Sequence, residues 1–167
     1  MKLYLIGMPY SGKSLIGQEV AKQLNLQFVD LDNEIEQIYQ TSIEDIFKEE
    51  GEEAFRTYET LVLASYKDKN NIVVSTGGGI VKRPVNKTFM KGLIIYIDTD
   101  IEVLEERGNQ SYSRPLLLKT SLYDLYNERR NLYEQFKTHT IENNGLVEDA
   151  VKNILTIVRT NHESINN

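Results

Sequence analysis

Short apolar runs alternate along the chain with longer stretches in which apolar residues recur at helical spacing. Apolar runs of about four to eight residues bounded by turn residues are typical of buried strands. The alternation predicts repeated strand–helix–strand units, and therefore a parallel sheet. The predicted strands are Lys2–Ile6, Gln27–Asp30, Ile72–Ser75, Leu93–Ile97 and, more weakly marked, Thr138–Glu142.

Helical spacing fills most of the chain between and after these strands. Ser42 with Asp45 resembles a capping box, and Asp100 directly precedes the helix predicted at Ile101–Arg107, where it can act as the cap. From Gly108 to Lys119 the helical spacing stops, and Gly, Asn, Ser and Pro predict a surface loop. The predicted helices are Lys13–Leu24, Asn33–Tyr39, Ile43–Glu50, Glu53–Lys69, Arg83–Met90, Ile101–Arg107, Ser121–Phe136 and Val147–Arg159.

Composition narrows the class of protein. The 167 residues suit one domain, 1–167, and the 40% apolar and 26% charged residues are ordinary for a globular protein. The net charge of −6 disfavours a nucleic-acid binder, and the lack of cysteine excludes disulfides and thiolate metal sites. The apolar run Leu3–Ile6 is too short for an export signal or a membrane span. We therefore expect a cytoplasmic protein without nucleic-acid or membrane partners, and we take it as a monomer.

The segment GMPYSGKS at 7–14 joins the first predicted strand to the first predicted helix and fits G-x4-G-K-[ST]. In such a loop, glycines let the backbone turn its N–H groups toward phosphate oxygens, and the helix N-terminus faces the same anion. Lys13 is placed to reach the β- and γ-phosphates of a nucleotide, and the Ser14 hydroxyl to ligate Mg²⁺. The alternative, a chance glycine turn, is disfavoured by the position and by the GKS triplet.

Two carboxylates, Asp30 and Asp32, stand at the end of the second predicted strand. Side chains alternate along a strand, so both project to one side if the extended conformation persists, at the edge where open α/β sheets bind ligands. Asp30 is then a candidate for holding Mg²⁺ through water, and Asp32 for orienting a substrate hydroxyl. The alternative is that Asp32 only caps the following helix.

Arg56 and Glu59 are three residues apart in a predicted helix and should share a face. They form either a surface ion pair worth about 0–1 kcal/mol, or a pair in which Glu59 orients Arg56 to clamp a carboxylate. Gly77, Gly78 and Gly79 follow the third predicted strand. Three glycines exceed what a plain turn requires, which indicates close approach of backbone and ligand.

The segment RRNLY at 129–133 contributes a further arginine, Arg129, for which the alternative is a solvated helix face. That alternative fits the neighbouring Arg130 better. His139 and His162 have no companions at metal-ligand spacing.

Taken together, these segments resemble the shikimate kinases, a family of the nucleoside-monophosphate-kinase-like P-loop group. The matching elements run from Leu3 to about Leu155 and are GMPYSGKS, FVDLD, GEEAFRTYE, GGG, RPLL at 114–117 and RRNLY. The resemblance implies a three-layer α/β/α fold with a five-stranded parallel sheet in the order 2-3-1-4-5. It also implies a substrate-binding helical region at about 32–60 and a lid at about 108–119.

By the same resemblance, the reaction is transfer of the γ-phosphate of ATP to a ring hydroxyl of shikimate, with Mg²⁺ as cofactor, in aromatic amino-acid biosynthesis. The family's catalytic groups correspond to Lys13, Asp32 and Arg114, and its metal site to Ser14 and Asp30. The implied ATP-binding residues are Gly7, Tyr10, Ser11, Gly12, Lys13, Ser14, Leu15, Arg107 and Arg114. The implied substrate-binding residues are Asp32, Arg56, Gly77, Gly78, Gly79 and Arg129. Arg107 resembles the arginine that stacks on adenine, and Arg114 the one that reaches the transferred phosphate.

The chain departs from the family pattern at Pro9, Tyr10, Asn131 and the segment 143–145, and none of these changes removes a group needed for phosphoryl transfer. Glycine is usual where Tyr10 stands, and tyrosine adopts positive φ less freely. Two alternatives therefore stay open. One is a kinase for gluconate or a nucleoside monophosphate, and the other is a nucleotide-binding regulatory module without turnover.

Overall fold

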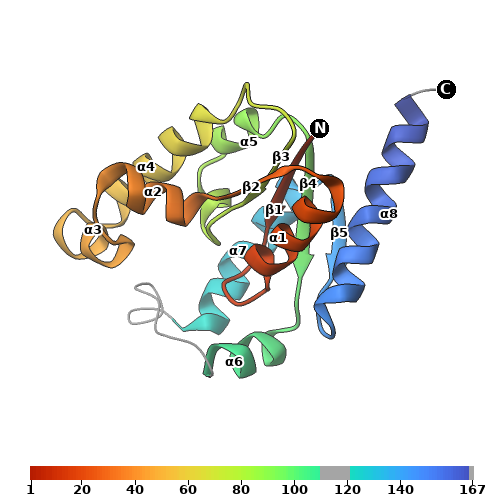
Figure 1. Ribbon diagram of the computed structural model, residues 1–167. Coiled ribbons are helices and arrows are strands. Elements are labelled where there is room, and N and C mark those ends of the chain that lie inside the picture. Colours follow the sequence, from red (N-terminus) through yellow and green to blue (C-terminus); the bar gives the residue numbers. More distant parts are fainter. Residues whose placement is uncertain (110–120, 166–167) are drawn as a thin grey trace.

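The computed structural model describes residues 1–109 and 121–165, which form a parallel sheet between two layers of helices (Figure 1). Its strands lie in the order β2-β3-β1-β4-β5, and every neighbouring pair is parallel. This confirms the predicted fold class and strand order. The strands are β1 (Lys2–Ile6), β2 (Gln27–Asp30), β3 (Ile72–Ser75), β4 (Leu93–Asp98) and β5 (His139–Glu142).

The helices confirm most of the predicted segments. A short 3₁₀ helix, η1 (Ile80–Lys82), follows the glycine triplet and was not predicted. The α-helices are α1 (Lys13–Leu24), α2 (Leu31–Tyr39), α3 (Ile43–Glu49), α4 (Glu52–Ser65), α5 (Val85–Phe89), α6 (Ile101–Asn109), α7 (Leu122–Phe136) and α8 (Val147–Ile165).

Alternation along the central strand β1 divides the core into two halves. Leu3 and Leu5 point to the face that α1 and α8 cover, where they meet residues such as Ile154. Tyr4 and Ile6 point to the opposite face, toward α4 and α7. All four side chains are fully buried. Each contributes roughly 1.5–3 kcal/mol by leaving water, so β1 helps to hold both helical layers to the sheet.

Several helix ends differ from the prediction for local reasons. The helix α2 begins at Leu31 rather than Asn33, because the Asp30 side chain accepts the first free backbone N–H groups. The helix α4 ends at Ser65 rather than Lys69, and the chain turns back to β3 through Asn71, whose φ is 57°. The helix α8 runs to Ile165, beyond the predicted end. No helix within 1–109 or 121–165 combines the length and apolar character needed to cross a membrane.

The helix cap predicted at Ser42 is confirmed, but the Asp45 carboxylate accepts from the Ser42 hydroxyl and not from its backbone N–H as in a full capping box. The Asp45 backbone N–H donates to Ser42 Oγ at 3.0 Å, and the Ser42 hydroxyl donates to the Asp45 carboxylate at 2.8 Å. This fixes the start of α3, which belongs with α2 and α4 to the segment predicted to bind substrate. The predicted side-chain cap at Asp100 stays a prediction.

Candidate active site

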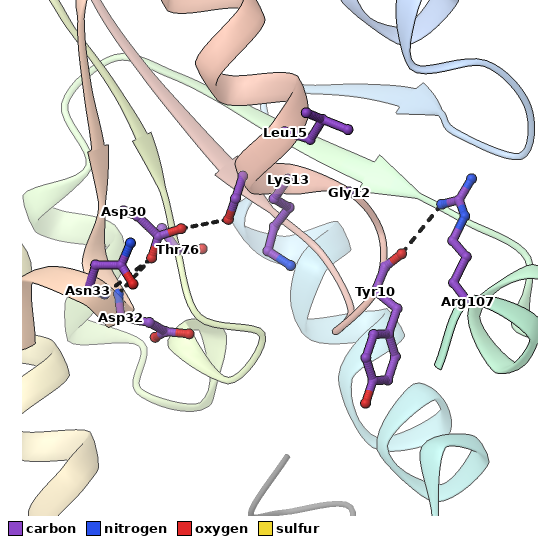
Figure 2. A pocket seen from close by; sticks show the side chains of 10 residues that line it. Tyr10, Gly12, Lys13, Leu15, Asp30, Asp32, Asn33, Thr76 and Arg107 are labelled. Carbon is purple, nitrogen blue, oxygen red and sulfur yellow. Dashed lines mark hydrogen bonds between the residues drawn. The ribbon is translucent and has the colours of Figure 1, made fainter. Parts of the chain in front are cut away.

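The predicted site residues converge at the carboxyl ends of the parallel strands, where the chain leaves β1, β2 and β3. A cavity of about 550 Å³ opens at this edge (Figure 2). It lies beside the central strand, from which the sheet order runs to β3 on one side and β4 on the other, the place where open α/β sheets bind ligands. The cavity is lined by Tyr10, Gly12, Lys13, Ser14, Leu15, Asp30, Asp32, Asn33, Thr76 and Arg107.

The loop between β1 and α1 has the geometry of a phosphate cradle. Gly7 and Gly12 adopt positive φ, 151° and 88°, which lets the backbone curl around the cavity. The Lys13 ammonium is buried in the loop, where it donates to the Met8 carbonyl at 2.7 Å. Because α1 begins at Lys13, its N-terminal N–H groups and dipole face the same space.

Tyr10 forms a side wall of this cavity. Its φ of 66° is left-handed, a conformation that costs a non-glycine residue about 1–2 kcal/mol. The ring packs against the core and lies so close to α6 that a Cβ at Gly108 would meet it at 3.0 Å. Figure 2 shows the ring turned away from Lys13, with the Tyr10 carbonyl facing Arg107. Tyrosine at this position therefore leaves the hollow above Lys13 open.

Asp30, and not Asp32, caps α2. One Asp30 oxygen accepts the N–H groups of Asp32 and Asn33 at 3.1 and 3.3 Å. The interpretation of Asp32 as the cap is therefore wrong. The strand also ends at Asp30, so the expected alternation of the two carboxylates along an extended segment is wrong as well. Both side chains line the cavity nevertheless, because the first turn of α2 carries Asp32 around to it.

The second Asp30 oxygen and the Ser14 hydroxyl form the candidate metal site. Ser14 Oγ donates to Asp30 Oδ2 at 2.5 Å and lies 3.1 Å from Ser75 Oγ. Hydroxyl and carboxylate oxygens are hard ligands of the kind Mg²⁺ prefers, and Mg²⁺ usually keeps several waters and phosphate oxygens besides. Among the residues that the structure describes, no group of three or more His, Cys, Asp or Glu side chains is arranged to hold a metal ion. The oxygens present therefore fit Mg²⁺ with few protein ligands.

Arg56 and Glu59 form a buried ion pair on α4. Arg56 Nη1 lies 2.8 Å from Glu59 Oε2, and the two side chains are 3% and 0% exposed. The alternative of a surface ion pair is therefore wrong. Burial raises the pKa of Glu59 to about 7, although the Arg56 guanidinium opposes this shift, and Asp32 raises it further. A carboxylate held this deeply has little freedom, and it fixes the direction in which the Arg56 fork points.

Each glycine of the triplet after β3 lies directly against a charged side chain of the site. A Cβ at Gly77 would stand 2.6 Å from Glu59 Oε1 and 2.9 Å from Asp32 Oδ1. One at Gly78 would stand 3.1 Å from Arg129 Nη1, and one at Gly79 would overlap the Arg56 guanidinium. The triplet is therefore the surface on which the candidate substrate-binding side chains converge, and any larger residue would displace them.

Arg129 is almost completely buried on α7, with 1% of its surface exposed. Its Nε and Nη2 atoms have no hydrogen-bond partner among the residues that the structure describes. Buried guanidinium groups are normally paired, so these donors indicate an anionic ligand. Arg130 is exposed, which confirms the solvated face expected for it.

Arg107 and the loop after β5 close the opposite side of the cavity. Arg107 donates to the carbonyls of Tyr10 and Asn143, at 3.4 and 2.9 Å. The buried Asn143 side chain donates to the Ser11 carbonyl at 2.8 Å and so ties β5 to the phosphate cradle. No local pattern assigned a role to Asn143, and its position just past the end of a parallel strand was the available signal. Thr76, also unassigned, lines the cavity for the same reason.

One predicted catalytic residue cannot be placed. Arg114, with most of the predicted lid, lies outside the described residues, and its role stays a prediction.

The pKa of Glu59 predicts a pH dependence of stability. Between its ordinary value of 4.5 and about 7, the folded protein holds a proton on Glu59 that the unfolded chain has released. The stability that this group contributes is therefore complete at low pH and is lost as the pH rises through 7. We expect Glu59→Gln to remove this slope, so that the unfolding free energy of the wild-type protein minus that of the variant falls from pH 5 to 7.5. Urea unfolding followed by circular dichroism across this range measures it, and a constant difference would contradict the raised pKa.

Comparison with known proteins agrees with this geometry. The sequence model of the family described as shikimate kinase matches residues 9–159. The shikimate kinase of Rippkaea orientalis is 41% identical over 166 residues, which cover 96% of this chain and 89% of that protein. The shikimate kinase of Acinetobacter baumannii, solved in complex with shikimate, aligns with a TM-score of 0.89 and 34% identity, over 96% of this chain and 93% of that one. A gluconokinase from Sinorhizobium meliloti 1021 aligns over 99% and 95% with a TM-score of 0.62 at 17% identity, a likeness of fold alone. The chain therefore belongs to the shikimate kinase family.

Proposed function

We propose that this protein transfers the γ-phosphoryl group of ATP to a ring hydroxyl of shikimate, giving shikimate 3-phosphate and ADP, within aromatic amino-acid biosynthesis. The observation that carries the proposal is the arrangement of a phosphate cradle, the cavity-lining Asp32 carboxylate and two buried arginines around the glycine triplet. Phosphoryl transfer asks a protein mainly for positioning and charge stabilisation, which this arrangement supplies. We also propose that the protein works in the cytoplasm and as a monomer.

The cradle side holds the nucleotide. Backbone N–H groups of the cradle, which Pro9 cannot supply, and the N-terminus of α1 face the phosphates, and the Lys13 ammonium moves from the Met8 carbonyl to the β- and γ-phosphate oxygens. Ser14 and Asp30 are the residues that would hold Mg²⁺, which supplies neutralisation of phosphate charge when it is bound. Arg107 and Leu15 lie at the outer part of the cavity, where the adenosine would leave it.

The glycine side holds the acceptor. Arg56 and Arg129 bind the substrate carboxylate, because both are buried and rigid, and because Nε and Nη2 of Arg129 still need acceptors. The hydroxyl oxygen attacks the γ-phosphorus, the bond from that phosphorus to the β–γ bridging oxygen breaks, and the hydroxyl proton passes to the Asp32 carboxylate. Asp32 is placed for this role, since it lines the cavity and lies against Gly77.

The alternatives named from the sequence are less well supported. Two buried arginines suit a carboxylate better than a nucleobase, which disfavours a nucleoside-monophosphate kinase. Gluconate also carries a carboxylate, but family membership favours shikimate over it. The regulatory module was suggested by Tyr10, and that residue lines the cavity without closing it.

The function is tested by coupled measurement of ADP release with ATP and Mg²⁺, in the presence of shikimate, gluconate, AMP or no acceptor. We expect release to depend on shikimate and the other acceptors to give only the background rate. Tight ATP binding with no acceptor-dependent release would instead support a binding module.

The role of Asp32 is tested by Asp32→Asn, which keeps the shape of the side chain and removes its basicity. We expect kcat to fall about 10²- to 10⁴-fold if the carboxylate accepts the hydroxyl proton. The exposed Asp68 supplies the matched control, because Asp68→Asn makes the same chemical change far from the cavity. An Asp32→Asn enzyme with wild-type kcat would reduce Asp32 to a lining residue.

The carboxylate clamp is tested by Arg56→Lys, which keeps a cation beside Glu59 and removes the planar fork. We expect KM for shikimate to rise about 10- to 100-fold, as for loss of a charge-assisted bond of about 1.5–3 kcal/mol, and KM for ATP to stay within about twofold. Arg130→Lys, on the exposed face of α7, should change neither constant. The clamp would be refuted if Arg56→Lys raised KM for a shikimate analogue without the carboxylate as much as it raises KM for shikimate.

A further inference from the structure

Tyr133 is a fully buried residue of α7 to which the reaction described above gives no part. It stands four residues after Arg129, so both side chains lie on the same face of the helix, directed at the glycine triplet. Its ring stacks on that of Tyr96 in β4, with centroids 5.0 Å apart and planes at 23°. The phenol is therefore held against the sheet with no freedom to turn away from the site.

The Tyr133 hydroxyl joins the parts of the site that come from distant segments of the chain. It donates to the Gly78 carbonyl at 2.5 Å and lies 3.7 Å from the Met8 sulfur of the phosphate cradle. The Arg129 guanidinium lies on the same face of α7, and its positive charge acts to lower the pKa of the phenol. Burial raises the pKa of Tyr133 to about 12, so the hydroxyl keeps its proton, and its donor role, at any physiological pH.

The Gly78 bond also bears on Arg129. The Arg129 Nη1 atom packs on the Gly78 backbone, where an added Cβ would stand 3.1 Å from it, and Nε and Nη2 have no hydrogen-bond partner among the described residues. A peptide held in one orientation by Tyr133 gives this guanidinium a fixed surface to pack on. The unpartnered donors are then presented in one direction.

The same hydroxyl orients the glycine backbone. Within a trans peptide the carbonyl and the following N–H point in opposite directions. The Gly78 carbonyl is turned toward Tyr133, so the N–H of Gly79 points away from α7. Gly78 and Gly79 lack the side chains that would restrict rotation of this peptide. The hydrogen bond that the Gly78 carbonyl accepts from Tyr133 supplies that restriction instead.

We propose that Tyr133 is a positioning residue for shikimate binding: its hydroxyl fixes the Gly78 carbonyl, and the glycine backbone held in this way, packed against Arg129, sets the carboxylate-binding fork. This role rests on the proposed function, because it assigns the same two groups to shikimate. Tyr133 itself touches no substrate in this arrangement and acts only through its neighbours.

The test is Tyr133→Phe, which removes one oxygen and keeps the ring stacked on Tyr96. We expect KM for shikimate to rise about tenfold, the usual size for loss of one buried hydrogen bond, with KM for ATP within about twofold and kcat within about threefold. Tyr96→Phe is the matched control. It removes a buried hydroxyl from the same stack, but that hydroxyl donates to Asp98 rather than to a substrate-binding group, so both KM values should stay at wild type.

A double-mutant cycle separates positioning from general loosening of the fold. Arg129→Lys removes the fork that Tyr133 orients, so adding Tyr133→Phe to it should cost less than about threefold further in kcat/KM for shikimate. If the two substitutions acted independently, their fold-changes in kcat/KM for shikimate would multiply. Wild-type affinity for ATP, measured by calorimetry, shows that each variant is folded around its nucleotide site.

The outcomes are distinguishable. If the wild-type protein and Tyr96→Phe do not phosphorylate shikimate, the proposed function fails and takes this role with it. If both do so, and Tyr133→Phe has a wild-type KM for shikimate or raises both KM values equally, only the positioning role is overturned. A selective rise in KM for shikimate that disappears in the Arg129→Lys background supports it.

Discussion

Charged side chains packed directly onto the backbone of Gly77–Gly79 are the constraint on which this site depends. Asp32 and Glu59 meet the first glycine, Arg129 the second and Arg56 the third. These side chains come from three helices that are distant in sequence, and they approach one another closely because Gly77, Gly78 and Gly79 have no side chains. A single added methyl group at Gly79 would occupy the position of the Arg56 guanidinium.

Burial of so much charge also explains how an acidic protein can bind anions. The chain carries a net charge of −6, yet the arginines at its centre are shielded from solvent and from most surface carboxylates. Each buried guanidinium loses hydration, and for Arg56 the ion pair with Glu59 offsets part of that loss. The Arg129 donors that have no partner among the described residues are a local source of specificity, because only a ligand with acceptors in the matching positions can accept their hydrogen bonds.

Local patterns predicted the fold and the cradle well, because both depend on residues that are close together in the sequence. Apolar runs located all five strands, and GMPYSGKS located the turn that curls at Gly7 and Gly12. The same local reasoning failed at Asp30 and Asp32. Two carboxylates next to a strand end are equally good caps on paper, and the position of the first helical residue decides which one is used.

Sequence alone thus determined the strand–helix alternation, the phosphate cradle and the set of polar residue types available for chemistry, since each depends on neighbours a few positions away. Only the tertiary structure decided that Arg56 and Glu59 are buried rather than exposed, that Tyr10 lies beside the cavity, and that Asn143 and Tyr133 belong to the site. The physical reason is that burial and hydrogen-bond partnership arise from contacts between segments tens of residues apart. Spacing along the chain does not encode those contacts until the sheet brings the segments together.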